Sequence, residues 1–382
     1  MKSRKVCMIT TAHRPFDDRI FHKEGQTLAR GGYEVVIIAP HDRDEIAGGI
    51  RIIPLPLRKK NGSLAAAIRA YRMALKTDAD VYHIHDPELL AAGVLLKILN
   101  GKKVIYDVHE DYGRKILSKE TIRKELRPPL SRIFTVLERT AAGMLYYVLA
   151  ADSNIRKKFG ANTEVIGNYP PIDFMVMRPP ARSGRTMKMV YIGGIDRDRG
   201  SRIMPEIMKH LEGYDIELHM AGPIADKDDI LALTSAGKIA YHGFLPWREV
   251  SKCLADADIG LLLLQPTPSY INCTGEGIIK LFEYMMMKLP IIVSDFPYLR
   301  QLITATGSGI CVDPTNPAKI AEAVKFLTGN PEVRRKMGEN GRMAVIREYN
   351  WEKEGRKLIA VYQKAFGQTQ QQGSAVISHD QI

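Results

Sequence analysis

Short apolar runs rich in β-branched residues alternate along this chain with segments whose apolar spacing is helical. In the first half, the apolar runs are residues 5–9, 34–39, 81–84, 104–108 and 145–150. Residues 21–31 and 87–99 have helical spacing, and the first of these segments ends at Gly31-Gly32, where a helix is expected to stop. This alternation predicts repeated βα units that build a parallel sheet.

The same alternation starts again in the second half, with apolar runs at residues 189–192, 216–220, 239–242, 259–264, 291–294 and 310–312. Between the two series, Pro170-Pro171, Pro179-Pro180 and Gly184 break both helices and strands. We therefore predict an α/β protein of two Rossmann-like, doubly wound domains, residues 1–168 and 187–350, joined by a linker at 169–186. A chain of 382 residues is long enough for two such hydrophobic cores.

The last part of the chain predicts a helix and a tail. Asn350 is placed to cap an amphipathic helix over residues 351–367, with Trp351, Leu358 and Tyr362 among its apolar contacts. Residues 368–382 are polar, and we expect them to be disordered.

Composition narrows the class of protein. The chain has 45% hydrophobic and 26% charged residues, which is typical of a soluble globular protein. Its four cysteines are far apart and form no CxxC pair, which argues against a disulfide framework and a zinc site. The sequence shows no export signal and no apolar stretch that could span a membrane. We therefore expect a cytoplasmic protein, at most peripheral on the inner face of the cell membrane.

The formal charge is +12, from 55 Lys and Arg against 43 Asp and Glu. Such a charge favours phosphorylated substrates, anionic lipid or nucleic acid as partners, but a solvated basic surface is the simpler explanation for scattered charges. Residues 114–139 combine eight basic side chains with apolar residues such as Leu117, Ile133 and Leu137, a pattern that fits an anionic membrane surface. Because Pro128-Pro129 interrupts this segment, a solvated helical surface is an equal interpretation. We find no aromatic and basic motif that predicts nucleic-acid binding.

Two loops that follow predicted strands of the second domain carry candidate ligand-binding residues. The first, YIGGIDRDRG, offers Gly193 and Gly194 for a close backbone approach and Arg197 and Arg199 as cations, which suits a diphosphate. Its glycines do not fit GxGxxG or GxxxxGK[ST], so a nicotinamide enzyme and a P-loop ATPase are disfavoured. The DRD at 196–198 lies within this arginine-rich loop, and we predict no metal requirement.

The second loop, residues 267–280, brings Gly275, Glu276, Gly277 and Ile278 to the start of a helix, whose amides face an anion favourably. Lys280 and Glu283 are three residues apart on that helix and therefore share one face. One of them can meet a phosphate while the other accepts hydrogen bonds from a ribose diol. The alternative for such a spacing is an ordinary surface ion pair.

From Tyr191 to about Tyr362, the chain resembles the donor-binding half of retaining family 4 glycosyltransferases, which have the GT-B fold of two Rossmann-like domains facing across a cleft. The resemblance rests on YIGGIDRDRG, HMAGP, YHGFLPWREV, ADIGLLLL, GEGIIKLFEYMMMKLPIIVSD and YNWEK in this order. It implies that Glu283 holds the nucleotide ribose and that the last helix crosses back to the first domain. Met285, Met286 and Met287 are assigned to core packing.

The sequence departs from the family pattern at two places. The usual glutamate eight positions before Glu283 is here Gly275, so loop amides or Glu276 would have to recognise the donor sugar. The usual loop arginine is here Gly194, and Arg199 stands where the family has a lysine; Arg197 is the candidate replacement for the missing charge.

In the first domain, VIYDVHEDY places His109 at the end of a strand, where the family often uses a histidine to contact the donor sugar. The alternative is a structural hydrogen-bonding histidine. Two further strand ends bring candidate acceptor-side residues to the same edge: His13, Asp17, Asp18, Arg19, His85 and Asp86. An equally good interpretation is that Asp17 or Asp18 caps the helix that starts near Arg19.

The resemblance implies transfer of a sugar from a nucleoside-diphosphate sugar, UDP- or GDP-linked, to an acceptor hydroxyl with retention of configuration. His109, Arg199, Lys280 and Glu283 are the predicted catalytic residues. The nucleotide sugar is a substrate, so no cofactor is expected, and the acceptor would be a sugar or a lipid-linked sugar of a bacterial surface polysaccharide or glycolipid. The alternatives are a non-hydrolysing sugar-nucleotide epimerase and a basic protein that binds membrane or nucleic acid without catalysis.

Overall fold

The computed structural model describes residues 4–56, 64–119, 121–173, 186–224, 237–267, 270–271 and 274–367. The predicted tail 368–382 and most of the predicted linker, residues 174–185, lie outside the described residues. The chain forms two compact units. The first contains Met1–Ala151, Ile155–Ile166 and Glu354–Ile382, and the second contains Asp152–Asn154 and Gly167–Lys353.

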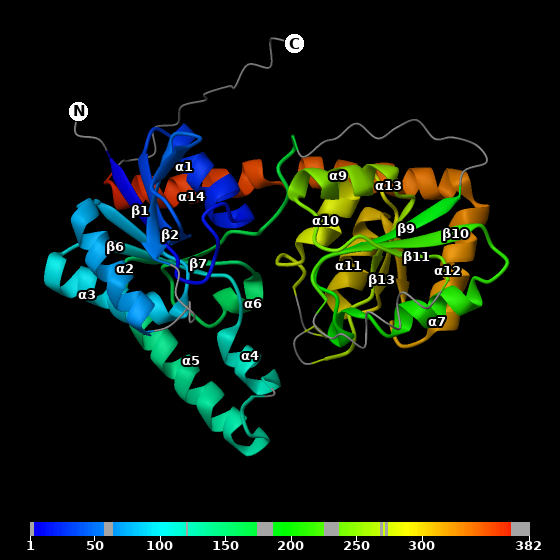
Figure 1. The fold of residues 1–382 in the computed structure, drawn as a ribbon, viewed down its shortest axis with the longest axis horizontal. Coiled ribbons are helices and arrows are strands. Elements are labelled where there is room, and N and C mark those ends of the chain that lie inside the picture. The colour runs from blue at the N-terminus through cyan, green and yellow to red at the C-terminus, as the bar shows by residue number, and fades with distance from the viewer. Residues whose placement is uncertain are drawn as a thin grey trace, which may run out of the picture. The chain divides into compact units, whose positions relative to one another are not determined.

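The first unit is built on an eight-stranded sheet of order β3-β4-β2-β1-β5-β6-β7-β8 (Figure 1). Every pairing in it is parallel except β3 with β4. The strands are β1 (Lys5–Ile9), β2 (Glu34–His41), β3 (Glu45–Ala47), β4 (Ile50–Pro56), β5 (Val81–Ile84), β6 (Lys103–Val108), β7 (Tyr147–Ala150) and β8 (Thr163–Val165). The strand order reverses between β1 and β5, which is where doubly wound sheets bind ligands.

Strand β4 is absent from the sequence prediction because it contains Pro54 and Pro56. Prolines in sheets are confined to edges, since they cannot donate a ladder hydrogen bond. The neighbouring strand β3 pairs only with Ile50, Arg51 and Ile52, so both prolines lie beyond β3 on an uncovered edge. Two prolines in the run IRIIPLP are therefore compatible with a strand here.

The helical segments of the first unit alternate with these strands. They are η1 (Asp18–Gly25), α1 (Gln26–Arg30), α2 (Leu64–Thr77), η2 (Pro87–Leu89), α3 (Leu90–Asn100), α4 (Tyr112–Ser118), η3 (Lys124–Leu126), α5 (Arg127–Met144) and, beginning in the other unit, α6 (Ser153–Arg156) and α14 (Trp351–Ala365). The buried core lies between sheet and helices and includes Ile9, Ile84, Leu96, Tyr106 and Leu149.

The predicted helix at 21–31 is in fact two segments, of which the first, η1, is a π-helix. The amide of His22 bonds to the carbonyl of Asp17 at 3.3 Å, which is the i→i+5 pattern of this wider turn. Residues five apart consequently lie above one another, and Arg19 Nε reaches Glu24 Oε1 at 2.9 Å. An α-helix would place these two side chains on different faces.

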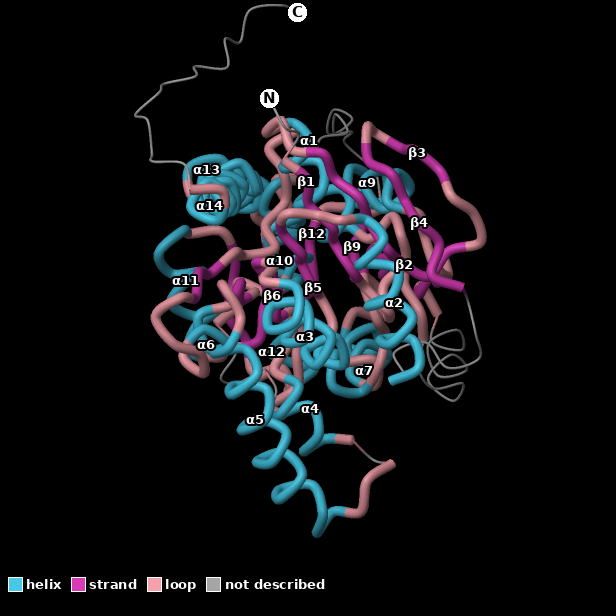
Figure 2. The backbone as a smooth tube through the Cα atoms, turned by 90° about the vertical axis from the view of Figure 1, so that its left-hand side faces the viewer, coloured by secondary structure: helices cyan, strands magenta, loops and turns pink. Residues whose placement is uncertain are grey.

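The basic segment is divided just before Pro128-Pro129 and not at these prolines, because α4 ends at Ser118 and α5 begins at Arg127. Both prolines lie in the first turn of α5, where their missing amides have no helical partner to lose. In Figures 1 and 2, α4 and the first turns of α5 extend together beyond the sheet of this unit. Ser131 Oγ donates to Gly113 O at 2.7 Å and joins the two helices.

The second unit has a six-stranded parallel sheet of order β11-β10-β9-β12-β13-β14. Its strands are β9 (Met187–Ile192), β10 (Ile216–Ala221), β11 (Ile239–Tyr241), β12 (Ile259–Leu262), β13 (Ile291–Ser294) and β14 (Gly309–Val312). Its helices are η4 (Arg197–Arg199), α7 (Ile203–His210), α9 (Trp247–Asp256), α10 (Ile279–Met286), α11 (Pro297–Thr306), α12 (Pro317–Gly329) and α13 (Pro331–Arg347). The order reverses between β9 and β12, and the methionines at 285–287 are buried in the core, as predicted.

The last helix, α14, begins after Asn350, whose Oδ1 accepts from the amide of Lys353 at 3.0 Å. Asn350 Nδ2 also donates to the carbonyls of Val345 and Ile346, each at 2.9 Å, so one buried side chain ends α13 and starts α14. From Glu354 onward the helix belongs to the first unit, where Tyr362 Oη and His83 Nδ1 are 2.9 Å apart. The helix therefore returns to the first unit, as expected.

No helix among the described residues is both long enough and apolar enough to cross a bilayer.

Candidate active site

In the second unit, the glycine loop lies after β9, next to the point where the strand order reverses. Gly193 has φ of +131°, and a side chain at this position would overlap the ammonium of Lys280. Lys280 comes from the first turn of α10, so loop and helix meet at this glycine. Gly193 and Lys280, which were predicted as separate binding residues, are therefore in contact.

Lys280 is half-buried at this meeting point. Its Nζ donates to Tyr191 Oη at 3.0 Å and lies 4.4 Å from the centre of the Tyr191 ring, while Tyr191 Oη donates to Gly194 O at 2.7 Å. Burial, together with the positive charge of Arg199, lowers the pKa of Lys280 to about 7. Lys280 thus holds its proton weakly. An anion bound beside the ammonium would raise the pKa of Lys280 again, because it favours the charged form.

Arg199 lies beside Gly194 of the same loop. Its guanidinium forms an ion pair with Asp196, approaches Gly194 and lies 5.9 Å from the centre of the Tyr270 ring. Burial alone would lower the pKa of Arg199, but Tyr270 and Asp196 outweigh it and raise that pKa, so the side chain stays charged. Arg197 is exposed in the short turn η4, and its role as the replacement for the missing loop charge stays a prediction.

The structure explains why Gly275 replaces the family glutamate. Its φ is +76°, and a side chain there would overlap the ring of Tyr298. Glu276 accepts hydrogen bonds from the amide and Oγ of Ser153, at 2.6 and 2.8 Å, a contact within the same unit. A shifted role of Glu276 in sugar recognition stays a prediction, and would require this contact to open.

The start of α10 has the form predicted for an anion site. Ile278 is its N-cap and supplies no side-chain hydrogen bond, while the space around Gly277 is open. Amides of a first helical turn without a side-chain cap favour negative charge. Glu283 follows Lys280 by three residues on the same helix and is half-buried, and its contact with a ribose stays a prediction.

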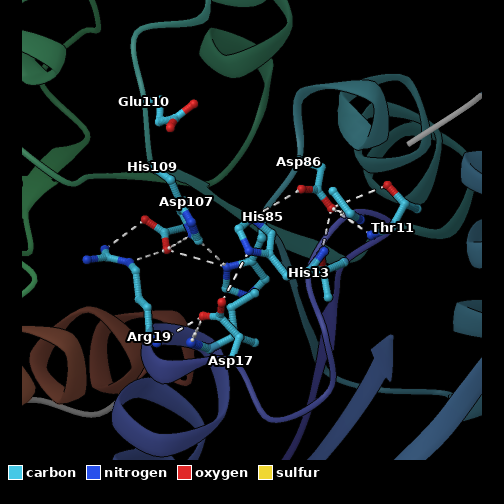
Figure 3. Close-up of polar contacts among 12 residues, drawn as sticks. Thr11, His13, Asp17, Arg19, His85, Asp86, Asp107, His109 and Glu110 are labelled. Atoms are coloured by element: carbon cyan, nitrogen blue, oxygen red, sulfur yellow. Dashed lines mark hydrogen bonds and ion pairs between the residues drawn. The ribbon is translucent and has the colours of Figure 1, made fainter. Parts of the chain in front are cut away.

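In the first unit, His109 follows the end of β6 and lies beside Asp107 (Figure 3). His109 Nε2 is 2.8 Å from Asp107 Oδ2, and His85 Nδ1 is 3.3 Å from His109 Nε2 and 3.4 Å from Asp107 Oδ2. The Asp107 side chain is completely buried, whereas that of His109 is 12% exposed. His109 is therefore the member of this group that a ligand can reach.

Arg19 is buried and binds Asp107 with two hydrogen bonds, Nε to Oδ2 at 2.8 Å and Nη2 to Oδ1 at 2.9 Å. Burial alone would raise the pKa of Asp107, but Arg19 and His109 outweigh it and hold that pKa well below its usual value. Burial and the nearby Asp107 charge raise the pKa of Glu24 well above its usual value. Within this cluster, the Arg19 guanidinium therefore favours the ionised form of Asp107, whereas burial and Asp107 disfavour ionisation of Glu24.

The remaining acceptor-side candidates have structural contacts. Asp17 caps η1 by accepting from the amides of Arg19 and Ile20 at 2.9 and 3.0 Å, so the capping interpretation is correct for this residue. Asp18 pairs with Lys23 at 2.7 Å. Asp86 is buried and accepts from Thr10 Oγ1 at 2.8 Å and from several groups of the loop after β1. Arg19, His85 and Asp86 are thus buried, and any contact with an acceptor stays a prediction.

His13 lies at the outer edge of the same group. Its Nδ1 is 3.2 Å from Asp17 Oδ2, and its ring centre is 5.1 Å from that of His109. Burial alone would lower the pKa of His13, but the Asp17 carboxylate outweighs it and raises that pKa.

Four buried side chains of this unit have ligand atoms within 4.8 Å of one another: Glu24, His83, His85 and Asp107. This donor set is chemically suited to a transition metal. The guanidinium of Arg19, however, already contacts both carboxylates, and a divalent ion would leave a net positive charge in the interior. The arrangement is accounted for as a charge cluster.

Sequence analysis missed Asp107, Glu24 and Tyr191. Asp107 had a signal, because it precedes His109 by two residues and alternate residues of an extended chain project to the same side. Glu24 had none, since its approach to Arg19 depends on the π turn.

Two family models match this chain. "Glycosyltransferase Family 4" matches residues 4–162 and "Glycosyl transferases group 1" matches residues 177–344. The chain belongs to glycosyltransferase family 4. The predicted family and enzyme class are thereby confirmed.

Among proteins similar to this glycosyltransferase is the MMP alpha-(1->4)-mannosyltransferase of Mycolicibacterium hassiacum, 24% identical over 314 residues, which are 78% of this chain and 74% of that protein. The phosphatidyl-myo-inositol mannosyltransferase of Mycobacterium leprae is 23% identical and aligns over 88% of this chain and 90% of its own length. Sucrose-phosphate synthase from Thermosynechococcus elongatus superposes with a TM-score of 0.75 at 17% identity, covering 95% of this chain and 99% of that one. This glycosyltransferase therefore has the GT-B fold of two Rossmann-like domains, as predicted.

Proposed function

We propose that this glycosyltransferase transfers a sugar, with retention of configuration, from a UDP- or GDP-sugar to an acceptor hydroxyl in the assembly of a bacterial surface polysaccharide or glycolipid. The observation that carries the donor assignment is the position of Lys280, which is half-buried against Gly193 and Tyr191 near Arg199. Two cations beside a glycine loop and a helix start without a side-chain cap form a site for a diphosphate.

In the proposed reaction, the bond between the anomeric carbon and the diphosphate oxygen breaks while the acceptor oxygen bonds to the same face of that carbon. Arg199, Lys280 and the first amides of α10 stabilise the charge that develops on the leaving diphosphate. A leaving phosphate oxygen takes the acceptor proton, so no protein nucleophile is required. Glu283 accepts hydrogen bonds from the ribose, and His109 contacts the transferred sugar.

The test is a panel of UDP-, GDP- and ADP-sugars assayed for release of the nucleoside diphosphate with and without saccharide acceptors. We expect turnover with one donor class and a rise in donor KM of roughly tenfold or more for Glu283→Ala, because hydrogen bonds to a carboxylate contribute about 1.5–3 kcal/mol. Glu322→Ala, an exposed carboxylate of α12 in the same unit, is the matched control. No turnover with any donor, or an unchanged KM in Glu283→Ala, would contradict the proposal.

We also propose that α4 and α5 contact an anionic membrane that carries the acceptor. Leu126, Leu130, Ile133 and Leu137 are exposed and follow a three- and four-residue spacing, which places the three α5 residues on one stripe. Exposed basic side chains flank them, at Arg123, Lys124, Arg132 and Arg139. Apolar side chains next to Lys and Arg are the composition of a membrane-surface helix.

Cosedimentation with vesicles of phosphatidylglycerol or of phosphatidylcholine tests this contact. We expect binding to the anionic vesicles that weakens with salt, and its loss on Ile133→Ser with Leu137→Ser. Ile46→Ser, an exposed apolar residue of β3 in the same unit, should bind as the unmodified protein does. Equal binding to both lipids, or binding unaffected by the paired serine substitutions, would refute the contact.

A further inference from the structure

We propose that Asp107, held by Arg19, is a positioning residue that fixes the tautomer and orientation of His109 for sugar transfer. The inference rests on the proposed function, because it assigns the way in which the His109 ring is prepared for the donor sugar. It concerns residues of the first unit alone.

The hydrogen bonds around Asp107 determine which ring nitrogen of His109 carries the proton. An ionised carboxylate only accepts hydrogen bonds, and Asp107 Oδ2 lies 2.8 Å from His109 Nε2. His109 therefore donates from Nε2, and in its neutral form Nδ1 has the lone pair. Among the described residues, Nδ1 of His109 has no hydrogen-bond partner. The atom left for a ligand is a hydrogen-bond acceptor.

Arg19 keeps Asp107 in the state that this requires. Its two parallel hydrogen bonds to both carboxylate oxygens fix the plane of the carboxylate as well as its charge. The guanidinium is itself fixed, because Nη1 donates to Ile166 O at 2.9 Å and the backbone amide of Arg19 is bound by the Asp17 cap. Rigid support of this kind is what a residue in contact with substrate needs.

His85 adds a second constraint. Its Nδ1 lies 3.4 Å from Asp107 Oδ2, so it can donate to the same oxygen, and its ring meets that of His109 edge-on, with centres 5.4 Å apart. Burial lowers the pKa of His85, so this ring is neutral and adds no competing charge. The His109 ring is thus held at its Nε2 edge and against one neighbouring ring.

The consequence for catalysis is specific. With Nε2–H bound to Asp107, His109 accepts a hydrogen bond at Nδ1 from a hydroxyl of the donor sugar and so orients that sugar. Loss of Asp107 would free the ring to take the other tautomer, which donates at Nδ1 and can no longer accept there. Sugar transfer should suffer while binding of the nucleotide alone should not.

The first measurement needs no substitution in the network. Long-range ¹H–¹⁵N correlation spectra of the histidine rings in the intact protein, with His109 assigned by the peak that disappears in His109→Asn, should show the Nε2–H tautomer in the neutral form of the ring. A ring that is predominantly the Nδ1–H tautomer would overturn the inference. This measurement is independent of whether any donor is turned over.

The second measurement is a double-mutant cycle with Asp107→Asn and His109→Asn. We expect Asp107→Asn to lower kcat roughly 10- to 100-fold, the usual effect of losing a partner that orients a functional histidine, and to leave the Kd for UDP or GDP within about twofold. If Asp107 acts through His109, the double variant should be no slower than His109→Asn alone. The inference would be refuted if the kcat reductions of the two single variants multiplied in the double variant, or if Asp107→Asn left kcat unchanged.

Asp80→Asn is the control for a purely structural, half-buried aspartate of the same unit, since Asp80 accepts from the amide of Lys5 at 2.9 Å at the start of β1. It should leave kcat and the His109 tautomer unchanged. If no donor is turned over in the assay, the proposed function is refuted. If the enzyme is active but His109 has the Nδ1–H tautomer, only the role of Asp107 is refuted.

Discussion

The protonation of Lys280 should set how tightly this glycosyltransferase binds a nucleoside diphosphate at different pH values. Lys280 has a pKa lowered to about 7 by burial and by Arg199, so about half of the unliganded molecules carry a neutral amine at pH 7. A diphosphate beside the ammonium favours the charged form, and binding above pH 7 must therefore take up a proton. Affinity should fall as the pH rises.

The size of the effect follows from the pKa. From pH 7 to pH 8.5, the charged fraction of Lys280 decreases from about one half to a few per cent, so the Kd for UDP or GDP should rise roughly 15-fold. This window lies above the terminal phosphate ionisation, near pH 6, so the ligand charge changes little within it. Isothermal titration calorimetry in buffers of different ionisation enthalpy measures both the Kd and the proton uptake.

Lys280→Met is the matched variant, because methionine retains most of the volume of lysine without its charge. It should bind UDP or GDP roughly 10- to 100-fold more weakly at pH 7, the value of a charge-assisted hydrogen bond, and its Kd should not change between pH 7 and pH 8.5. A flat profile for the unmodified protein, or the same slope in Lys280→Met, would refute the reasoning.

Two further predictions concern stability, each measured by urea unfolding. Gly275→Glu, which restores the family glutamate, should lower the free energy of unfolding by about 2 kcal/mol or more, because φ is positive and the side chain would overlap Tyr298. The control is Gly277→Ala, where the added methyl group enters open space. It should change the free energy of unfolding by less than about 1 kcal/mol. Equal stability of the two variants would contradict this account of Gly275. Asn350→Ala should lower the free energy of unfolding by about 1–3 kcal/mol, because the α14 cap and the hydrogen bonds to two α13 carbonyls are lost together. A cost no greater than that of an exposed alanine substitution would contradict it.

Much of the fold was predictable because continuous β-branched runs are the signature of strands buried on both faces. The predicted bounds of β1, β5 and β13 agree with the structure. Strand β4 was missed because its two prolines are acceptable only beside a short neighbour, and neighbours in a sheet are set by tertiary structure. The two prolines of α5 were misinterpreted for a related reason, since the same residues break a helix interior and begin a helix.

The candidate site was predictable where chemistry depends on spacing along one element and not where it depends on packing. Gly193 and Lys280 could be proposed separately, but their contact follows from the meeting of β9 and α10. The pKa of Lys280 could not be inferred at all, since burial and Arg199 cause it. The absence of the family glutamate was visible in the sequence, whereas its steric reason, the ring of Tyr298, was not.

The contacts made by the π-helix at Asp18–Gly25 depend more on the number of residues in this segment than on the identity of each residue. Removing one residue there, even the exposed His22, would allow the helix to relax to a narrower turn and would swing Glu24 away from Arg19. Substitutions on the exposed face should be neutral, while a single deletion should break the Arg19–Glu24 ion pair beside Asp107. When relatives of this enzyme are aligned, a one-residue gap in this helix is therefore a sharper sign of altered chemistry than many substitutions.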